Sequence, residues 1–415
     1  MKNNKELKTL IFSDFFFPDS MGGANKMAYH SSRGLVKKGH RVMLVTRRAR
    51  PDLPDRETID GIEVFRYDLP RKTFTGYNFS ARPKIRKILN SIEGEVNALD
   101  LIILHQPLVA LEAVTHPFIG DTPWIYNFHS PWGEEFRISR SFKWLNMLNP
   151  GFLFQKRIKD WIEDRVLKRC QRIIVLSRFM QEQLENIHGM SNKSVIIPGG
   201  VDTEVFSPPK DKCFIREELG LPQGKIILFT VRNLRQRMGL MNLIKAMVDL
   251  GDIREKVHLV IGGKGDLGDK LKRFSADQKI ENSITFSGHI SQEDLPKFYK
   301  AADFFILPTE KLEGFGMVTL EALATGLPVI ATPVGATPEI INQVDRGWLC
   351  EDSSSKSLSL KIAYRSGWFI QHPHEYKEVS RRCRNLAVKK YSWPRIMEHW
   401  ETECEEVIEA CKRWN

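Results

Sequence analysis

Apolar runs of strand length alternate with helical patterns along the whole chain. The runs are continuously apolar rather than alternating between apolar and polar residues. Strands covered by helices on both faces have this pattern, so it predicts parallel sheets flanked by helices. In the first half of the chain these runs are LKTLIFSDFFF (7–17), RVMLVTRR (41–48), LDLIILHQP (99–107), PWIYNFHS (123–130) and QRIIVLSRF (171–179).

The pattern breaks at VIIPGGVDTEVFSPPK (195–210), where three prolines and two glycines bracket a segment with no helical period. Such a composition is typical of an interdomain linker. The alternation then restarts, and a helix is expected over residues 317–325 with Gly326 as its stop. The strands expected in this half are KIILFTVRN (225–233), VHLVIGGKG (257–265), SITFSGH (283–289), DFFILPTE (303–310) and LPVIATPVG (327–335).

Two α/β domains, each with a doubly wound parallel sheet, follow from this organisation, and 415 residues are too many for one ordinary core. We expect residues 1–200 to form the first domain and 201–393 the second. Residues 394–415 are amphipathic with apolar positions near helical spacing, so we expect a C-terminal helix that packs against the first domain.

Charge is unevenly distributed along the chain. The formal charge is +11, and residues 1–170 hold 28 Lys and Arg against 19 Asp and Glu, a net of +9. A basic half suggests an anionic partner, such as a phosphate-bearing acceptor or an anionic membrane face, and a solvated basic surface is an equal alternative. Nucleic acid is disfavoured, because no recognised module or interleaved stacking aromatics accompany the charge.

The remaining composition predicts a cytoplasmic protein. The six cysteines show no CxxC spacing, which fits reduced thiols and argues against a zinc ribbon or a disulfide framework. No run of about 18 apolar residues occurs, and the N-terminus lacks the pattern of a signal peptide. Residues 139–169 mix aromatic and basic side chains, which fits either an interfacial membrane helix or a core helix with a basic outer face.

Candidate ligand-binding residues follow the expected strands, because ligands of open α/β sheets bind beyond the carboxyl ends of the strands. Gly22 and Gly23 precede a helix and allow close approach to a ligand, although a tight turn explains them equally well. His129 is suited to donate a hydrogen bond to a sugar hydroxyl, although a structural histidine is favoured when it is considered alone.

A basic loop follows the first strand of the second half, in TVRNLRQRMGL (230–240). Arg232, Arg235 and Arg237 lie in this loop, ahead of a helix. Guanidinium groups beside a helix N-terminus suit a diphosphate, because both supply donors to anionic oxygens. A solvated basic loop is the alternative.

The stretch EGFGMVTLE (313–321) places a carboxylate on each side of a glycine-rich turn. The backbone amides of Gly316, Met317, Val318 and Thr319 open the helix, and amides in a first turn lack intrahelical partners. These amides are suited to donate hydrogen bonds to a phosphate group. The two carboxylates suit the hydroxyls of a ribose and a sugar, so the stretch describes a nucleotide-sugar site. In the alternative interpretation, Glu313 is a loop residue and Glu321 lies on a solvated helix face.

Glu313 to Glu321 resembles the E-x7-E motif of the GT4 family of retaining glycosyltransferases. That family has the GT-B fold, in which two Rossmann-like domains face each other across a cleft. The resemblance extends in the family's order over nearly the whole chain, through GGANKMA, GHRV, IIPGGVDTEVF, IGGKGDL, FSGHISQEDLPKFYKAADFFILPT and GLPVIATPVGATPEII.

The resemblance implies roles for the matching residues. Glu321 binds the ribose, Glu313 and His129 face the transferred sugar, and Gly22 and Gly23 lie on the phosphate and acceptor side. The nucleotide base lies near Gly263 and Gly288, and the backbone from Phe315 through Gly316, Met317 and Val318 to Thr319 holds the sugar and phosphates.

One departure from the family concerns the diphosphate. The usual Arg and Lys positions hold Asn233 and Met238, as in a branch that carries RMGL. We expect Arg232 or Arg237 to take over the phosphate role, with Arg237 preferred.

The predicted function is a retaining transfer of a hexose or N-acetylhexosamine from a nucleoside-diphosphate sugar, UDP-linked, to a hydroxyl acceptor in cell-surface polysaccharide or glycoconjugate synthesis. The expected acceptor is a hydroxyl-bearing glycan, a lipid-linked molecule or a small molecule. No D-x-D motif occurs, so we expect no metal and no cofactor. The alternatives are a non-catalytic nucleotide-sugar-binding partner and a transferase acting on a small-molecule natural product.

Overall fold

The computed structural model describes residues 6–20, 22–69, 74–140 and 150–413. The chain divides into two compact units. Unit 1 comprises residues 1–198 and 396–415, and unit 2 comprises residues 199–395. The sequence placed the corresponding boundaries after residues 200 and 393.

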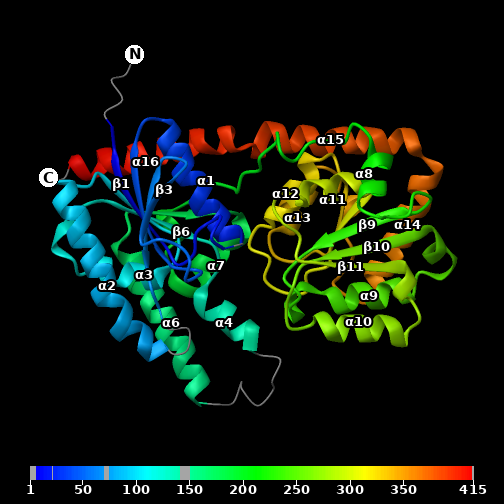
Figure 1. Ribbon diagram of the computed structural model, residues 1–415, viewed down its shortest axis with the longest axis horizontal. Helices are drawn as coiled ribbons and strands as arrows, with labels where there is room; N and C mark the ends of the chain where they lie inside the picture. Colours follow the sequence, from blue (N-terminus) through cyan, green and yellow to red (C-terminus); the bar gives the residue numbers. More distant parts are fainter. Residues whose placement is uncertain (1–5, 21, 70–73, 141–149, 414–415) are drawn as a thin grey trace. The chain divides into compact units, whose positions relative to one another are not determined.

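Unit 1 is built on an eight-stranded sheet in the order β3-β4-β2-β1-β5-β6-β7-β8. Figure 1 labels β1, β3 and β6 of this sheet. All neighbouring strands are parallel except β3 and β4. The central strands are buried along their length, as their continuously apolar sequences predicted. The strands are β1 (Lys8–Ser13), β2 (Arg41–Arg47), β3 (Arg56–Ile59), β4 (Ile62–Tyr67), β5 (Leu101–Leu104), β6 (Trp124–Phe128), β7 (Arg172–Val175) and β8 (Ser194–Ile196).

Helices connect these parallel strands. The first, α1, begins at Gly23, so Gly22 precedes it and Gly23 opens it. Its last residue is Lys37, and Gly39 follows at positive φ. The helices of unit 1 are α1 (Gly23–Lys37), α2 (Phe74–Glu95), α3 (Pro107–Ala113), α4 (Trp132–Arg140), α6 (Pro150–Arg169) and α7 (Arg178–His188), with short 3-10 turns η1 (Pro117–Ile119) and η2 (Ser191–Lys193).

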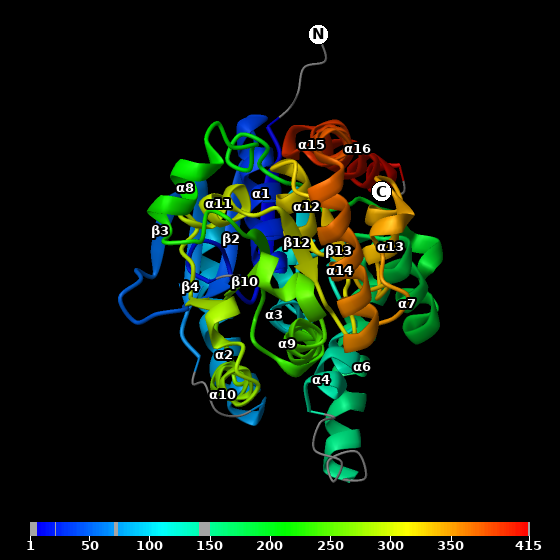
Figure 2. The ribbon, with the colours of Figure 1, turned by 90° about the vertical axis from the view of Figure 1, so that its right-hand side faces the viewer.

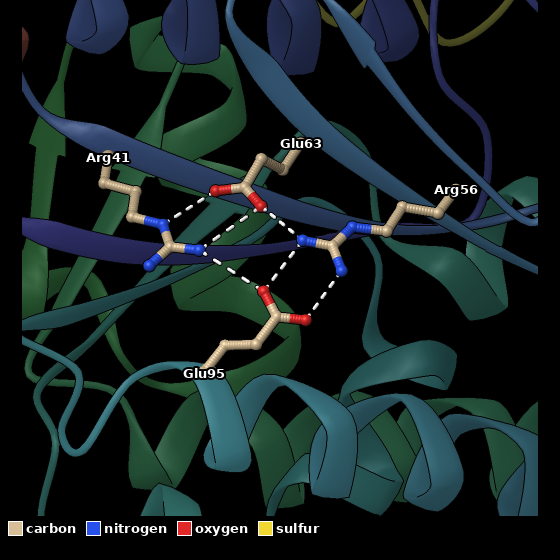
Figure 3. A network of polar contacts seen from close by, with 4 residues as sticks. All are labelled: Arg41, Arg56, Glu63 and Glu95. Atoms are coloured by element: carbon tan, nitrogen blue, oxygen red, sulfur yellow. Dashed lines mark hydrogen bonds and ion pairs between the residues drawn. The ribbon is translucent and has the colours of Figure 1, made fainter.

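Four charged side chains join β2, β3, β4 and α2 in the network shown in Figure 3. Arg41 Nε donates to Glu63 at 2.7 Å, and the Arg56 guanidinium donates to Glu63 and Glu95 at 2.8 Å or less. These side chains are partly exposed, so each pair contributes modestly. Arg41 begins β2, which places the network away from the carboxyl ends of the strands. It therefore holds the edge of the sheet together.

Unit 2 contains a five-stranded, wholly parallel sheet in the order β11-β10-β9-β12-β13. Together with unit 1, this confirms the prediction of two Rossmann-like α/β domains of the GT-B fold. Figure 2 shows this unit with β12, β13 and α12 in view. The strands are β9 (Ile226–Val231), β10 (Val257–Gly262), β11 (Ile284–Gly288), β12 (Phe304–Leu307) and β13 (Val329–Ala331).

The helices of unit 2 cover its sheet, and the chain then enters a long C-terminal helix. They are α8 (Lys212–Glu218), α9 (Leu240–Val248), α10 (Gly268–Asp277), α11 (Leu295–Ala301), α12 (Met317–Ala324), α13 (Thr337–Ile341), α14 (Ser355–Gln371), α15 (Pro373–Tyr391) and α16 (Trp393–Lys412), with 3-10 turns η3 (Gln236–Met238), η4 (Gly251–Lys256), η5 (Glu281–Ser283) and η6 (Arg346–Trp348).

The C-terminal helix α16 buries one face, as its amphipathic sequence predicted. Ile396, Trp400, Cys404 and Val407 are buried, whereas Cys411 is partly exposed. Lys38, the C-cap residue of α1, pairs with Glu401 at 2.9 Å, so α16 is fixed to the rest of unit 1 by both apolar and ionic contacts. Among the described residues, no helix is both long and apolar enough to cross a membrane.

Candidate functional site

The loop between β12 and α12 (308–316) is held by two glycines of neighbouring segments. Gly239 has φ +72°, and a Cβ there would overlap the carbonyl oxygen of Pro308. Gly335 has φ +61°, and a Cβ there would overlap the carbonyl oxygen of Glu313. Only glycine combines this backbone conformation with so close an approach. The loop is therefore fixed from both sides at the carboxyl end of β12.

Glu313 lies in this loop and is 8% exposed. Its Oε2 accepts hydrogen bonds from a guanidinium nitrogen of Arg232 and, at 3.0 Å, from the Thr309 hydroxyl. Arg232 Nη2 also lies 3.0 Å from the Thr309 hydroxyl, so the three side chains form one cluster. A buried carboxylate requires such a partner. Glu313 is thus a loop residue whose carboxylate is buried and paired, and its role in sugar binding stays a prediction.

Gly316 is the N-cap of α12 with φ +85°, and a Cβ there would lie 3.1 Å from the Thr319 hydroxyl. That hydroxyl is buried and has no hydrogen-bond partner among the described atoms. The Thr319 amide donates to the Gly316 carbonyl at 2.8 Å, so one of the four predicted phosphate donors is already engaged. Met317 and Val318 are partly exposed in the first turn.

Glu321 is 4% exposed, one turn further along α12. Its Oε2 accepts a hydrogen bond from the Tyr299 hydroxyl at 2.9 Å. Burial, reinforced by the negative charge of Glu321, raises the pKa of Tyr299 well above its usual value, so Tyr299 remains a neutral donor. The alternative of a solvated helix face is wrong, because this carboxylate is buried and oriented by a specific partner.

The arginines of the basic loop (230–240) differ in their partners and in their exposure to solvent. Arg237 Nη1 donates to the carbonyl of Leu312 at 2.7 Å, which brings its guanidinium next to the backbone that precedes Glu313. Arg235 and Asn233 are exposed. Arg232 is turned inward and forms an ion pair with Glu313.

Gly263 and Gly288 lie at the carboxyl ends of β10 and β11. The Gly263 amide donates to the Gly288 carbonyl at 2.5 Å, and the Arg232 amide donates to the Gly262 carbonyl at 3.1 Å. Phe315 is buried and makes an edge contact with Tyr391. Unit 2 thus brings most of the predicted donor-binding residues to one edge of its sheet.

Gly22, Gly23 and His129 lie in unit 1, at the carboxyl edge of its sheet. Gly22 is the N-cap of α1, and Gly23 is the first residue of that helix. The loop before them is anchored by Asp19, whose carboxylate accepts two hydrogen bonds from Arg66 of β4, from Nε at 2.6 Å and from Nη2 at 3.0 Å.

His129 directly follows β6, and its Nε2 lies 3.0 Å from Nδ1 of His105, which directly follows β5. Burial lowers the pKa of His129 to about 4, so the imidazole is neutral at physiological pH. A neutral imidazole suits a hydrogen bond to a sugar hydroxyl rather than an ion pair.

Sequence reasoning missed three residues of these clusters: His105, Tyr299 and Thr309. His105 directly follows the apolar run LIIL (101–104), which is a signal that could have identified it. Tyr299 and Thr309 carry no comparable signal, because only the tertiary fold brings them to Glu321 and Glu313. No group of His, Cys, Asp and Glu residues that could hold a metal ion occurs in the described ranges.

Comparison with known proteins agrees with this geometry. Residues 21–205 match the family model "Glycosyltransferase Family 4", and residues 211–366 match "Glycosyl transferases group 1". An uncharacterized glycosyltransferase of Methanocaldococcus jannaschii, MJ1607, is 26% identical over 388 residues, which are 91% of this chain and 93% of that protein.

Two further similar proteins are described with a sugar donor or with bound ligands. A GDP-mannose-dependent phosphatidylinositol monomannoside mannosyltransferase of Mycolicibacterium smegmatis is 27% identical over 53% of this chain and 58% of that protein. The structure of Anabaena Alr3699/HepE in complex with UDP and glucose superimposes with a TM-score of 0.75, at 17% identity, over 97% of this chain and 100% of that one.

The chain has the GT-B fold, and its two glycosyltransferase domain matches and its relatives support a glycosyltransferase. The two domain matches, which together span most of the chain, and the glycosyltransferase relatives support its membership in a GT4-type family of that class.

Proposed function

We propose that the chain is a retaining, metal-independent glycosyltransferase that moves a hexose or N-acetylhexosamine from a nucleoside-diphosphate sugar to a hydroxyl acceptor, in the synthesis of cell-surface polysaccharide or glycoconjugate. The observation that carries the proposal is the pair of buried carboxylates, Glu313 and Glu321, at the two sides of the glycine-rich start of α12. Each has a specific hydrogen-bond donor, so each is held in one orientation.

The proposed binding of the donor uses these residues. Glu321 accepts hydrogen bonds from the ribose diol, and Glu313 faces the transferred sugar. Arg237 and the first-turn amides of α12 receive the diphosphate, because cations and helix N-termini are fixed donors to anionic oxygens. We assign the chain to the RMGL branch, in which Arg237 replaces the usual phosphate-binding pair.

The proposed reaction is a same-face displacement. The bond between the anomeric carbon and the diphosphate oxygen breaks, and a bond to the acceptor oxygen forms on the same face. The acceptor's proton passes to an oxygen of the leaving diphosphate. Arg237 and the α12 amides stabilise the charge that develops on this group without reorganisation, and His129 contacts the transferred sugar. Glu313→Gln is therefore expected to lower turnover while nucleotide binding persists.

The nucleotide is proposed to be UDP. Its support is the UDP-bound structural neighbour, and the GDP-mannose-dependent relative supplies the alternative base. We also propose that the reaction takes place in the cytoplasm, because all six cysteines are free thiols, as expected in a reducing compartment.

Peripheral contact with an anionic membrane is proposed for helix α6. Phe154 and Trp161 are 65% and 56% exposed, and the exposed Arg157 and Arg165 lie between and after them on the same face. Aromatic and basic side chains on one face are typical of an interfacial helix. Residues 141–149 of the stretch that suggested this contact lie outside the described residues. Flotation with anionic liposomes is expected for wild type and not for Phe154→Ser/Trp161→Ser; equal flotation of both would contradict the proposal.

A thermal-shift panel of UDP, GDP, ADP and their sugars tests the donor site. A ligand at about 100 times its Kd stabilises by roughly 2.7 kcal/mol, which moves a melting temperature by several degrees. We expect a shift with one nucleotide in wild type and in the exposed control Glu281→Ala, and its loss in Glu321→Ala. No shift with any nucleotide would refute the donor site. A shift without turnover of the sugar donor would favour the non-catalytic binding partner.

A further inference from the structure

Asp14 is a charged side chain at the carboxyl edge of unit 1 that no part of the proposed donor chemistry uses. It follows β1 directly, in the same loop that leads to Gly22. Strands β1, β5 and β6 are adjacent and in register, with Phe12 opposite Leu104 and Leu104 opposite Tyr126. Their carboxyl ends therefore lie along one edge, which carries Asp14, His105 and His129 in turn.

Within the described residues, the surroundings of Asp14 satisfy its backbone amide but leave one carboxylate oxygen, Oδ1, without a hydrogen bond. The Asp14 amide donates to Gln106 Oε1 at 2.7 Å, and the Ser13 hydroxyl donates to the same oxygen at 3.1 Å. Asp14 Oδ1 is buried and has no hydrogen-bond partner within the described parts of the chain. Buried polar atoms in folded proteins nearly always have a partner, so such an atom requires an explanation.

Two cations lie near enough to act on Asp14 without bonding to it. Burial raises the pKa of Asp14 to about 6, and the charges of Arg47 and Lys159 oppose that rise. The Arg47 guanidinium lies over the Phe15 ring, and the Lys159 ammonium lies over the Trp132 ring at 3.7 Å from its centroid. The side chain therefore lies in a partly buried environment without a specific ionic partner, which destabilises the folded chain.

We propose that Asp14 binds a hydroxyl group of a pyranoside acceptor at the carboxyl edge of β1. A carboxylate with unused acceptor capacity is suited to the hydroxyls of a sugar, as the acidic residue of dinucleotide sites is suited to ribose. The position agrees with the rule that ligands of open α/β sheets bind beyond the carboxyl ends of the strands. This inference rests on the proposed glycosyl transfer and names the residue that recognises its acceptor.

The test separates acceptor binding from donor binding. Release of nucleoside diphosphate is measured with the donor identified by thermal shift, first with water alone and then with p-nitrophenyl glucoside, galactoside, mannoside and N-acetylglucosaminide. The variants are Asp14→Asn and the control Asp121→Asn, which alters an exposed aspartate of the same unit. Asp14→Asn is expected to raise the KM for the stimulating glycoside at least tenfold, because hydrogen bonds to a charged group are of that strength. The donor shift and the release in water should stay within twofold.

An unchanged KM, or equal losses of transfer and of release in water, would overturn the proposal. If no glycoside stimulates release, the same glycosides are examined by saturation-transfer NMR. Signal in wild type and in Asp121→Asn but not in Asp14→Asn would support the site, and equal signal in all three or none in wild type would overturn it. Failure of the proposed function is distinguishable, because it appears as the absence of any donor shift.

Discussion

Replacing Asp14 by Asn should stabilise the protein at neutral pH. The carboxyl has a pKa of 3.8 in an unperturbed chain and about 6 in the folded state. A folded-state pKa above the unfolded value means that the folded state binds the proton more tightly. The charged side chain therefore costs little folding free energy below pH 4, and this cost grows as the pH rises from about 4 to about 6. A difference of about two units corresponds to about 3 kcal/mol above pH 7, as an upper limit. Asn mimics the protonated carboxyl and removes this penalty.

The assay compares the unfolding free energies of Asp14→Asn and wild type by denaturant titration at pH 4.5 and pH 8. Because the chain has two units, hydrogen exchange of the β1 and β5 amides should be measured alongside the denaturant titration. The exchange rates report the opening of unit 1 directly. We expect the variant to gain up to about 3 kcal/mol at pH 8 and much less at pH 4.5. The control Asp121→Asn should show no pH-dependent gain. Equal stability of Asp14→Asn and wild type at pH 8 would refute the reasoning, because Asp14 would then carry no burial penalty.

Three further outcomes follow from the same structure. Arg232→Met breaks the buried pair with Glu313 and should lower the free energy of unfolding, measured by chemical denaturation, by about 3–5 kcal/mol. The double variant Arg232→Met/Glu313→Gln should recover part of this loss. A loss below about 1 kcal/mol would mean that the pair is solvated. Gly239→Ala should destabilise by clearly more than Gly251→Ala, because both glycines have positive φ but only Gly239 faces a carbonyl oxygen, so equal melting temperatures would contradict the packing described for the loop. His129→Gln should leave the shape of the kcat/KM pH profile between pH 6 and 7 unchanged. The His129 pKa is about 4, so its protonation becomes significant only as pH falls towards that value. Loss in the variant of a limb between pH 6 and 7 would contradict this.

The sequence predicted most of the fold because the strands are continuously apolar. Runs such as LDLIILHQP and KIILFTVRN identify buried parallel strands without further information, and β5 and β9 lie within them. The strands β3, β4 and β8 were not predicted, and β8 (Ser194–Ile196) overlaps the start of the expected linker 195–210. Arg56–Ile59 is short and charged, and Ile62–Tyr67 contains Glu63 and Arg66, whose charges are accommodated by partners that only the fold supplies. Helix α12 ends at Ala324, one residue before the expected end.

The site was predictable where chemistry and local sequence coincide, and not where it depends on contacts between distant segments. Glu313 and Glu321 could be identified because glycines and a helix start lie between them. Their burial, and their bonds to Arg232 and Tyr299, join residues that are 81 and 22 positions apart. No pattern within a window of sequence can show that Arg232 is committed to Glu313.

That commitment accounts for the departure of this chain from the usual Arg and Lys pattern. The Met238 sulfur lies 3.0 Å from Arg232 Nη2, and Met238 is 7% exposed. A lysine at this buried position would place a second cation against Arg232, where like charges in a medium of low polarity repel strongly. The apolar Met238 therefore allows Arg232 to turn inward and bind Glu313. Arg237 donates to the Leu312 carbonyl and so lies beside the backbone that precedes Glu313, which is the position from which we propose that it binds the diphosphate.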